Sequence, residues 1–270
     1  MTRVHDALFV FSTGRCGTQW LAAALGQCLG DRAVVAHEPL GRDYASREML
    51  GAGDPSSLGP DAADAIRDHV AAIEATLETR PYIECGHPAW SAIPYLVTRF
   101  AGRVRVLHLV RHPVPTAWSW VTHRAYCPPL APHLRERVLL SPFDEGIRLT
   151  SYRERWPALN PYEKSLFYWA EVNAFGLRAA ENSGAPWLRV RFEDLVRGDA
   201  LPRVLEFAGA GATTNPERVG LVDEFRWLTE FWCDPALVAQ HPDVVATAAA
   251  LGYDALAFDE TRLRQRYSGR

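Results

Sequence analysis

The sequence predicts an α/β protein in which helices flank a central parallel sheet, giving three layers. Short apolar runs typical of buried strands alternate with segments whose apolar residues recur at helical spacing. Strands that alternate with helices pair in parallel and are covered on both faces. The chain has 270 residues, of which 48% are apolar, and this suffices for a sizeable core. We therefore expect a single domain over residues 1–270.

The elements of the N-terminal half are, in order, a strand over 7–11, a helix over 20–29, a strand over 34–36, a loop over 41–60 and a helix after Pro60. The apolar run 7–11 is short enough for a buried strand and leads directly into a glycine-containing loop. Several glycines, serines and prolines predict the loop at 41–60. The helix after Pro60 has acidic residues near its start and one apolar side, formed by Ala65, Ile66, Val70, Ile73 and Leu77.

The C-terminal half continues with strands over 82–84 and 104–110, a helix over about 115–122, an insertion or lid over 124–160, a helix over 162–181, a strand over 187–192 and a mostly helical remainder. Pro115 suits the first turn of its helix. Prolines, arginines and aromatic residues interrupt the pattern over 124–160. This segment is interpreted either as a lid over an acceptor or as a surface excursion packed for stability. In a lid, the apolar walls would be Tyr126, Phe143, Tyr152 and Trp156.

Composition excludes several classes of protein. A net charge of −3 and a pI near 6.3 disfavour binding of nucleic acid or an anionic membrane through the overall field. Because no apolar run approaches the roughly 20 residues of a membrane-spanning helix, we expect a soluble cytoplasmic protein. The five cysteines are widely spaced and form no CxxC pair. They predict reduced thiols rather than a disulfide framework or a zinc site, and no metal is expected.

A glycine-containing loop follows the first strand. Gly14 and Gly17 allow the backbone to approach an anion, while the N–H groups and dipole of the next helix face it. Arg15 would add a bidentate clamp, and Thr18 a hydroxyl donor. The loop lacks the lysine and glycine spacing of a nucleoside triphosphate loop, and Lys164 is the one lysine of the chain. A magnesium-dependent ATPase is therefore disfavoured.

A second anion motif follows the strand at 104–110. Arg111 stands at the strand end in Arg111-His112-Pro113, and Ser119 follows eight residues later. A helix that begins near residue 114 would bring Ser119 round towards Arg111 and a shared phosphate. Both motifs lie at the carboxyl ends of predicted strands, where open parallel sheets bind ligands.

These two segments resemble a known family. FVFSTGRCGTQWL is similar to the 5′-phosphosulfate loop of the sulfotransferases, and VLHLVRHPVPTAWSWV is similar to their 3′-phosphate motif. YWAEVN and VRFEDLV also resemble stretches common in that family, so the likeness covers roughly residues 6–210. The resemblance implies a P-loop-like fold, 3′-phosphoadenosine 5′-phosphosulfate (PAPS) as sulfuryl donor, 3′-phosphoadenosine 5′-phosphate (PAP) as product, and no metal.

Carried over by position, the resemblance assigns donor binding to Thr13, Gly14, Arg15, Cys16, Gly17, Thr18, Gln19, Trp20, Arg111 and Ser119. Within this set Trp20 would lie against the adenine. Arg15 replaces the lysine of the cytosolic branch, as in the carbohydrate-modifying and bacterial branches. Cys16 replaces a usual serine and Gln19 a usual threonine, which alters or removes one phosphate contact. The C-terminal arginine-lysine-glycine segment of the cytosolic branch has no counterpart.

Two residues compete as the catalytic base that takes the acceptor's proton, while Arg15 suits stabilisation of the leaving phosphate. His87 is similar to the catalytic histidine of the cytosolic sulfotransferases. Glu38 is similar to the catalytic carboxylate of some bacterial carbohydrate sulfotransferases. Glu38 and Glu84 are both placed to approach the site. Three further histidines adjoin strands or turns and are interpreted as structural: His37, His108 and His112.

The sequence thus predicts a sulfotransferase that acts by in-line displacement on a hydroxyl, or as a second choice an amine, of a small metabolite or glycan. One alternative is a nucleotide-dependent phosphotransferase. The other is a sulfotransferase homologue that binds a nucleotide or partner without turnover. These motifs specify neither the acceptor nor the oligomeric state.

Overall fold

The computed structural model describes residues 5–130, 137–209 and 228–269. Within them, five parallel strands form a sheet in the order β2-β3-β1-β4-β5. The strands are β1 (Ala7–Phe11), β2 (Val34–His37), β3 (Tyr82–Cys85), β4 (Val104–Val110) and β5 (Trp187–Arg191). β1 lies in the middle, between β3 and β4, so the loop that follows it leaves from the centre of the sheet.

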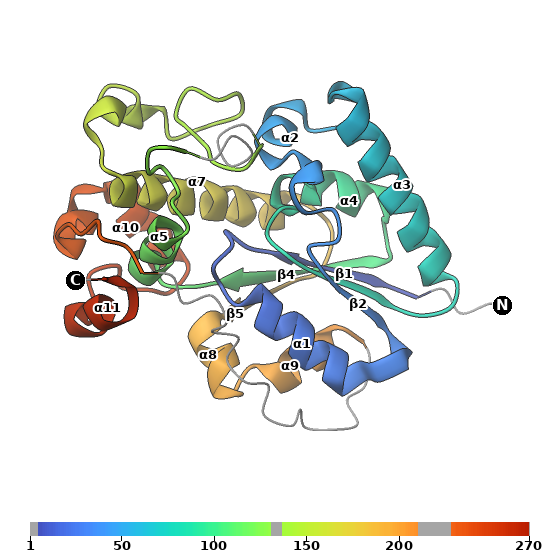
Figure 1. The fold of residues 1–270 in the computed structure, drawn as a ribbon. Coiled ribbons are helices and arrows are strands. Elements are labelled where there is room, and N and C mark those ends of the chain that lie inside the picture. The colour runs from blue at the N-terminus through green and yellow to red at the C-terminus, as the bar shows by residue number, and fades with distance from the viewer. Residues whose placement is uncertain (1–4, 131–136, 210–227, 270) are drawn as a thin grey trace.

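Helices cover both faces of this sheet (Figure 1). The α-helices are α1 (Thr18–Leu29), α2 (Ser46–Ala52), α3 (Pro60–Leu77), α4 (Ile93–Arg99), α5 (Pro113–Thr122), α7 (Pro161–Asn182), α8 (Phe192–Arg197), α9 (Leu201–Phe207), α10 (Pro242–Ala250) and α11 (Glu260–Tyr267). Helices α1, α8 and α9 lie on one face, and α3, α4 and α7 on the other. The predicted three-layer α/β class is confirmed.

Alternation along β1 divides the core between the two faces. Leu8 and Val10 pack with apolar residues of α1, α8 and α9. Phe9 and Phe11 point the other way and pack with residues of α3, α4 and α7. Because both sets are buried, the strand reads as a continuous apolar run rather than an alternating one.

The prediction of a loop over residues 41–60 is wrong in part. The segment contains α2 and two short 3₁₀ turns, Gly41–Tyr44 and Pro55–Ser57. Tyr44 and Met49 are buried in the core, and the Ser46 hydroxyl donates to the carbonyl of Pro88 at 2.7 Å. These tertiary contacts hold a seven-residue helix that local propensity does not predict. Helix α4 was also not predicted.

Residues 124–160 carry short 3₁₀ turns, at Thr150–Tyr152 and Trp156–Ala158, in their described part. The rings of Tyr152 and Trp156 each pack on Phe167 of α7, and the Tyr126 ring contacts Trp156. Phe143 is exposed. Two of the four proposed wall residues therefore pack directly on α7, and Tyr126 packs on one of these two. Closure of this segment over an acceptor stays a prediction. Residues 131–136 of the segment lie outside the described residues.

No helix among the described residues has the length and apolar composition needed to cross a bilayer.

Candidate active site

The loop after β1 is closed by its own hydrogen bonds. The Gly14 N–H donates to the Ser12 hydroxyl at 2.9 Å, and the Thr13 hydroxyl donates to the Gly14 carbonyl at 3.1 Å. The Cys16 thiol, fully buried, donates to the same carbonyl and lies 3.3 Å from the Thr13 hydroxyl. Burial raises the pKa of this thiol. Cys16 therefore occupies the interior of the loop as a neutral side chain.

Both loop glycines are required by close approach and by backbone conformation. Gly14 and Gly17 have φ of 74° and 84°. A Cβ on Gly14 would lie 2.9 Å from His87 Cγ, and one on Gly17 would lie 2.6 Å from the ring of Phe192. Arg15 between them also adopts a positive φ, 58°, which is strained for a non-glycine residue. The loop thus packs directly against the residues that follow β3 and β5.

Helix α1 begins at Thr18, immediately after the loop, so its N-terminal N–H groups face the same region. The Thr18 hydroxyl lies 3.3 Å from Nε2 of His37. Gln19 is exposed, and Trp20 is half-buried against the core on the α1 face.

The two predicted arginine anchors lie side by side. Arg111 Nη1 donates to the Arg15 carbonyl at 2.8 Å, and Arg15 Nε donates to the Ser119 hydroxyl at 3.0 Å. Burial and, after it, the charge of Arg111 lower the pKa of Arg15. Two neighbouring guanidinium groups in a partly buried site repel each other, and a bound anion would relieve that repulsion. The structure therefore brings Arg15, Arg111 and Ser119 into one cluster.

The surroundings of Arg111 fix its direction. Its carbonyl accepts a hydrogen bond from Trp169 Nε1 at 3.0 Å, and its guanidinium lies 4.6 Å from the centre of the Phe192 ring. Arg111 Nη2 donates to the hydroxyl of Tyr267 at 3.0 Å. Phe192 lies within the VRFEDLV segment, whereas no sequence signal points to Tyr267.

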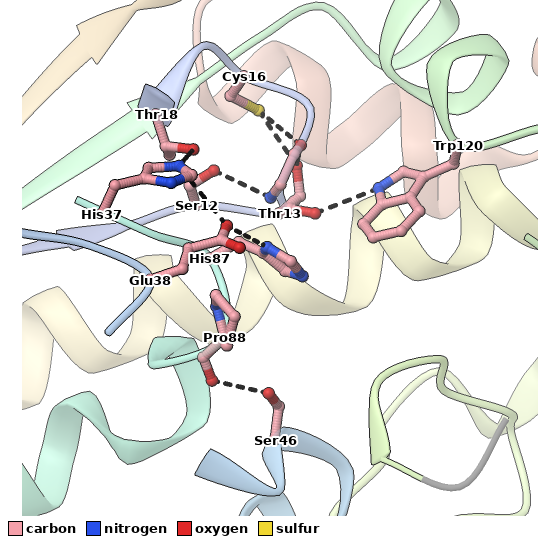
Figure 2. A network of polar contacts seen from close by, with 11 residues as sticks. Ser12, Thr13, Cys16, Thr18, His37, Glu38, Ser46, His87, Pro88 and Trp120 are labelled. Carbon is pink, nitrogen blue, oxygen red and sulfur yellow. Dashed lines mark hydrogen bonds and ion pairs between the residues drawn. The ribbon is translucent and has the colours of Figure 1, made fainter. Parts of the chain in front are cut away.

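Figure 2 shows that the two predicted base candidates contact each other. His87 Nδ1 and Glu38 Oε1 are 3.0 Å apart, and the two side chains are 15% and 30% exposed. Glu38 has a φ of 49°, and its N–H donates to the carbonyl of Cys85 at 3.1 Å. A Cβ on Gly86 would lie 2.7 Å from Glu38 Cγ. The backbone on both sides is thus shaped to bring this pair together.

The carboxylate of Glu38 is held ionised. Burial raises its pKa, but the hydrogen bond to His87 and the charges of His87 and His37 outweigh burial and lower the pKa to about 2. An ionised carboxylate only accepts hydrogen bonds, so His87 donates through Nδ1. With Nδ1 as the donor, the neutral form of the His87 imidazole would carry its lone pair on Nε2. That nitrogen is buried and has no hydrogen-bond partner in the described part of the chain.

His37, interpreted from the sequence as structural, is part of this network. Its Nε2 lies 3.3 Å from the Thr18 hydroxyl and 3.9 Å from Glu38 Oε1, so it links the start of α1 to the carboxylate. Trp120 also joins the site: its indole N–H donates to the Thr13 carbonyl at 3.2 Å, and its ring meets that of His87 edge-on at 5.5 Å.

The two other histidines have structural contacts, as the sequence predicts. His108 is buried and lies 3.0 Å from Asn173 Oδ1, and the side chain of His112 caps α5.

Contrary to the expectation from the sequence, Glu84 does not approach the site. This buried carboxylate accepts hydrogen bonds from the hydroxyls of Tyr44 and Tyr82 at 2.7 and 3.0 Å. Its second oxygen also lies 2.8 Å from Nε2 of His69 on α3. The side chain is therefore committed to a polar cluster between β3 and α3.

The described residues contain no group of three or more His, Cys, Asp or Glu side chains that could hold a metal ion.

This fold defines an α/β protein whose parallel sheet has a glycine-containing loop after its central strand. No protein-family model matches the sequence, and no curated protein matches it. Several solved structures are similar to it. The chain is similar to a sulfotransferase from Alicyclobacillus acidocaldarius, with 16% identity and a TM-score of 0.53 over 97% of this chain and 100% of that one. That likeness establishes the shared fold.

Two further structures are similar over most of their length. One is the sulfotransferase domain of the Synechococcus PCC 7002 olefin synthase, with 19% identity and a TM-score of 0.48 over 94% of this chain and 98% of that one. The other is a sulfotransferase domain from the curacin biosynthetic pathway, with 15% identity and a TM-score of 0.45 over 98% of this chain and 99% of that one.

Proposed function

We propose that this chain, as one domain, is a sulfotransferase that moves a sulfuryl group from PAPS to a hydroxyl, or as a second choice an amine, of a small metabolite or glycan. The observation that carries the proposal is the cluster in which the Arg111 guanidinium donates to the Arg15 main-chain carbonyl and the Arg15 guanidinium donates to Ser119. Two arginines from separate strand ends meet beside the N-terminus of α1 and a loop shaped for an anion. This arrangement suits a donor whose ribose carries phosphate groups at both its 3′ and its 5′ oxygen.

The donor would lie along the carboxyl edge of the sheet. In this proposal the backbone N–H groups of the loop, together with Arg15 and Thr18, hold the 5′-phosphosulfate. Arg111 and Ser119 hold the 3′-phosphate, and Trp20 borders the adenine. Because Arg15 lies in the loop that holds the 5′-phosphosulfate, its charge would also stabilise the charge that builds on the leaving phosphate.

His87 and Glu38 divide the work of proton removal. A carboxylate with a pKa of about 2 is too weak a base for an alcohol, so Glu38 positions the histidine and stabilises its protonated form. His87 Nε2 takes the acceptor proton as the acceptor oxygen bonds to sulfur. The bond between sulfur and the bridging phosphate oxygen breaks, and its electron pair leaves with PAP.

A phosphotransferase is less well supported. Such enzymes commonly place a lysine on the transferred phosphate. Here Lys164 lies on α7 over the ring of Trp156, at 5.2 Å from its centre, and the loop itself offers arginine.

The test is a titration with PAP and with magnesium ATP on wild type, Arg111→Ala and the control Arg67→Ala. Arg67 is an exposed arginine on α3 that pairs with Asp64. We expect wild type and the control to prefer PAP, and Arg111→Ala to bind PAP roughly 10- to 100-fold more weakly, the range for losing hydrogen bonds to a charged group. A preference for magnesium ATP in wild type would favour the phosphotransferase instead.

A non-catalytic homologue would pass that binding test. Release of PAP from PAPS in the presence of a panel of hydroxyl and amine acceptors separates turnover from binding. Activity that depends on both an acceptor and His87 supports the enzyme.

A further inference from the structure

The C-terminal helix places a tyrosine hydroxyl on Arg111. Tyr267 ends α11 and is 6% exposed. Arg111 donates to its hydroxyl through Nη2, while Nη1 of the same guanidinium donates to the Arg15 carbonyl. A tyrosine hydroxyl that accepts one hydrogen bond keeps its own proton for a second partner. None of the described residues accepts that proton.

The position of Tyr267 is fixed by its backbone and by packing. Its carbonyl accepts a hydrogen bond from Thr229 at 2.9 Å, and Gly269 donates to the Thr229 carbonyl at the same distance. Leu263, one turn earlier in α11, is buried in the same apolar cluster as Val114 of α5. The hydroxyl is therefore held at Arg111 by the fold of the C-terminal segment.

A stack of aromatic residues anchors α11 further. The Arg264 guanidinium lies 4.6 Å from the centre of the Trp232 ring, and Trp232 stacks on Trp118 of α5 at 4.2 Å. Trp118 in turn stacks on Tyr162 of α7 at 4.8 Å. The helix that carries Tyr267 is thus attached to the helix that carries Ser119.

We propose that Tyr267 is a donor-binding residue, whose hydroxyl donates a hydrogen bond to the phosphate monoester that Arg111 holds. The inference rests on the proposed function and extends it to the C-terminal helix. With a phosphate in place, the hydroxyl accepts from Arg111 and donates to the phosphate, so both of its hydrogen-bonding capacities are used. Tyr267 would then favour adenosine nucleotides that carry a 3′-phosphate over those that do not.

The experiment compares PAP with adenosine 5′-monophosphate by calorimetric titration of wild type, Tyr267→Phe and Tyr162→Phe. The phenylalanine at 267 keeps the ring and removes only the hydroxyl. Tyr162→Phe is the matched control, because it removes a buried hydroxyl of the same cluster that donates to the carbonyl of Pro235. We expect Tyr267→Phe to weaken PAP binding roughly 10-fold or more and to leave monophosphate binding unchanged. The control should bind both ligands as wild type does.

Two outcomes for Tyr267→Phe would overturn this inference and leave the proposed function standing: equal weakening of PAP and monophosphate binding, or no weakening of either. In both cases the preference of wild type for PAP would still disappear in Arg111→Ala. A wild type without preference for PAP overturns the proposed function as well. Amide hydrogen exchange on wild type gives a test without substitution. PAP should slow exchange in residues 260–267 more than the monophosphate does, and equal protection contradicts the proposal.

Discussion

At the scale of single residues, the contact between His87 and Glu38 changes how the two base candidates are understood. From the sequence alone, His87 and Glu38 are alternative bases, each similar to the catalytic base of a different branch of the sulfotransferases. In the structure they are one pair, joined at 3.0 Å, with the carboxylate held ionised. The buried Nε2 of His87, without a partner among the described residues, is the group that remains for an acceptor.

This pairing makes a kinetic prediction. We expect His87→Ala to lower kcat by roughly 10²- to 10⁴-fold, the usual contribution of a general base. Glu38→Ala should lower kcat less, because the imidazole remains but loses its orientation and the charge that stabilises its protonated form. Glu38→Gln should recover part of this loss, since its amide oxygen can still accept the Nδ1 hydrogen bond.

The double variant decides between a pair and two independent bases. If Glu38 acts through His87, then His87→Ala combined with Glu38→Ala should be no slower than His87→Ala alone. A further loss of the size seen in Glu38→Ala would mean that the carboxylate acts on the acceptor directly. The measurement is the steady-state rate of PAP release at saturating donor for wild type, the two single alanine variants and the double variant.

At the scale of elements, those with strong local signals were predicted closely. The apolar runs of β1 and β4 end at a glycine loop and at Arg111-His112-Pro113, and the observed strands match the predicted bounds. Helix α2 was missed because contacts distant in sequence, such as the one between Ser46 and Pro88, hold it in place.

The same reasoning separates the predicted and unpredicted parts of the site. Sequence patterns next to them identify several site residues as candidates: those of the loop, Arg111, His87 and Glu38. Which of them touch depends on the strand order, and no spacing fixes the placement of β2 beside β3. Tyr267 reaches Arg111 across 156 residues, and a single tyrosine near a chain end has no pattern that would reveal it.

The turn from β1 into α1 gives a prediction at this scale. Gly17 and Gly30 flank α1 and both have positive φ, but only at Gly17 would a Cβ meet another residue, the ring of Phe192. We expect Gly17→Ala and Gly30→Ala each to lose about 1 kcal/mol of unfolding free energy from backbone strain. Gly17→Ala should also weaken PAP binding, because the loop must move away from Phe192. Urea unfolding and PAP titration measure the two effects, and equal PAP affinity in both variants would contradict the role given to the loop.

At the scale of the whole molecule, the site lies where the core clusters meet. The residues of β1 contribute to the cores on both faces of the sheet. Helix α5, which carries Ser119, packs its apolar residues against those of α7, α10 and α11. Unfolding of the sheet therefore removes the site.

A group in this core whose pKa changes on folding affects the stability of the whole chain. His108 of β4 is such a group, since it is 1% exposed and its ring lies 4.8 Å from that of Phe11.

Burial lowers the pKa of His108 from 6.5 to about 3, so the folded protein keeps this imidazole neutral where the unfolded chain protonates it. Between pH 6.5 and about 3 the unfolded state binds more protons at this position, and stability must fall as the pH falls, by up to about 1.4 kcal/mol per pH unit. We expect His108→Gln, which retains a donor for Asn173 but cannot titrate, to be less stable than wild type at pH 7.5, since the amide does not reproduce the ring's packing. That deficit should shrink steadily on acidification through this window. Urea unfolding of both proteins at pH 7.5, 6 and 5 measures the difference, and a deficit that stays constant over this range would show that His108 is not held neutral in the folded state.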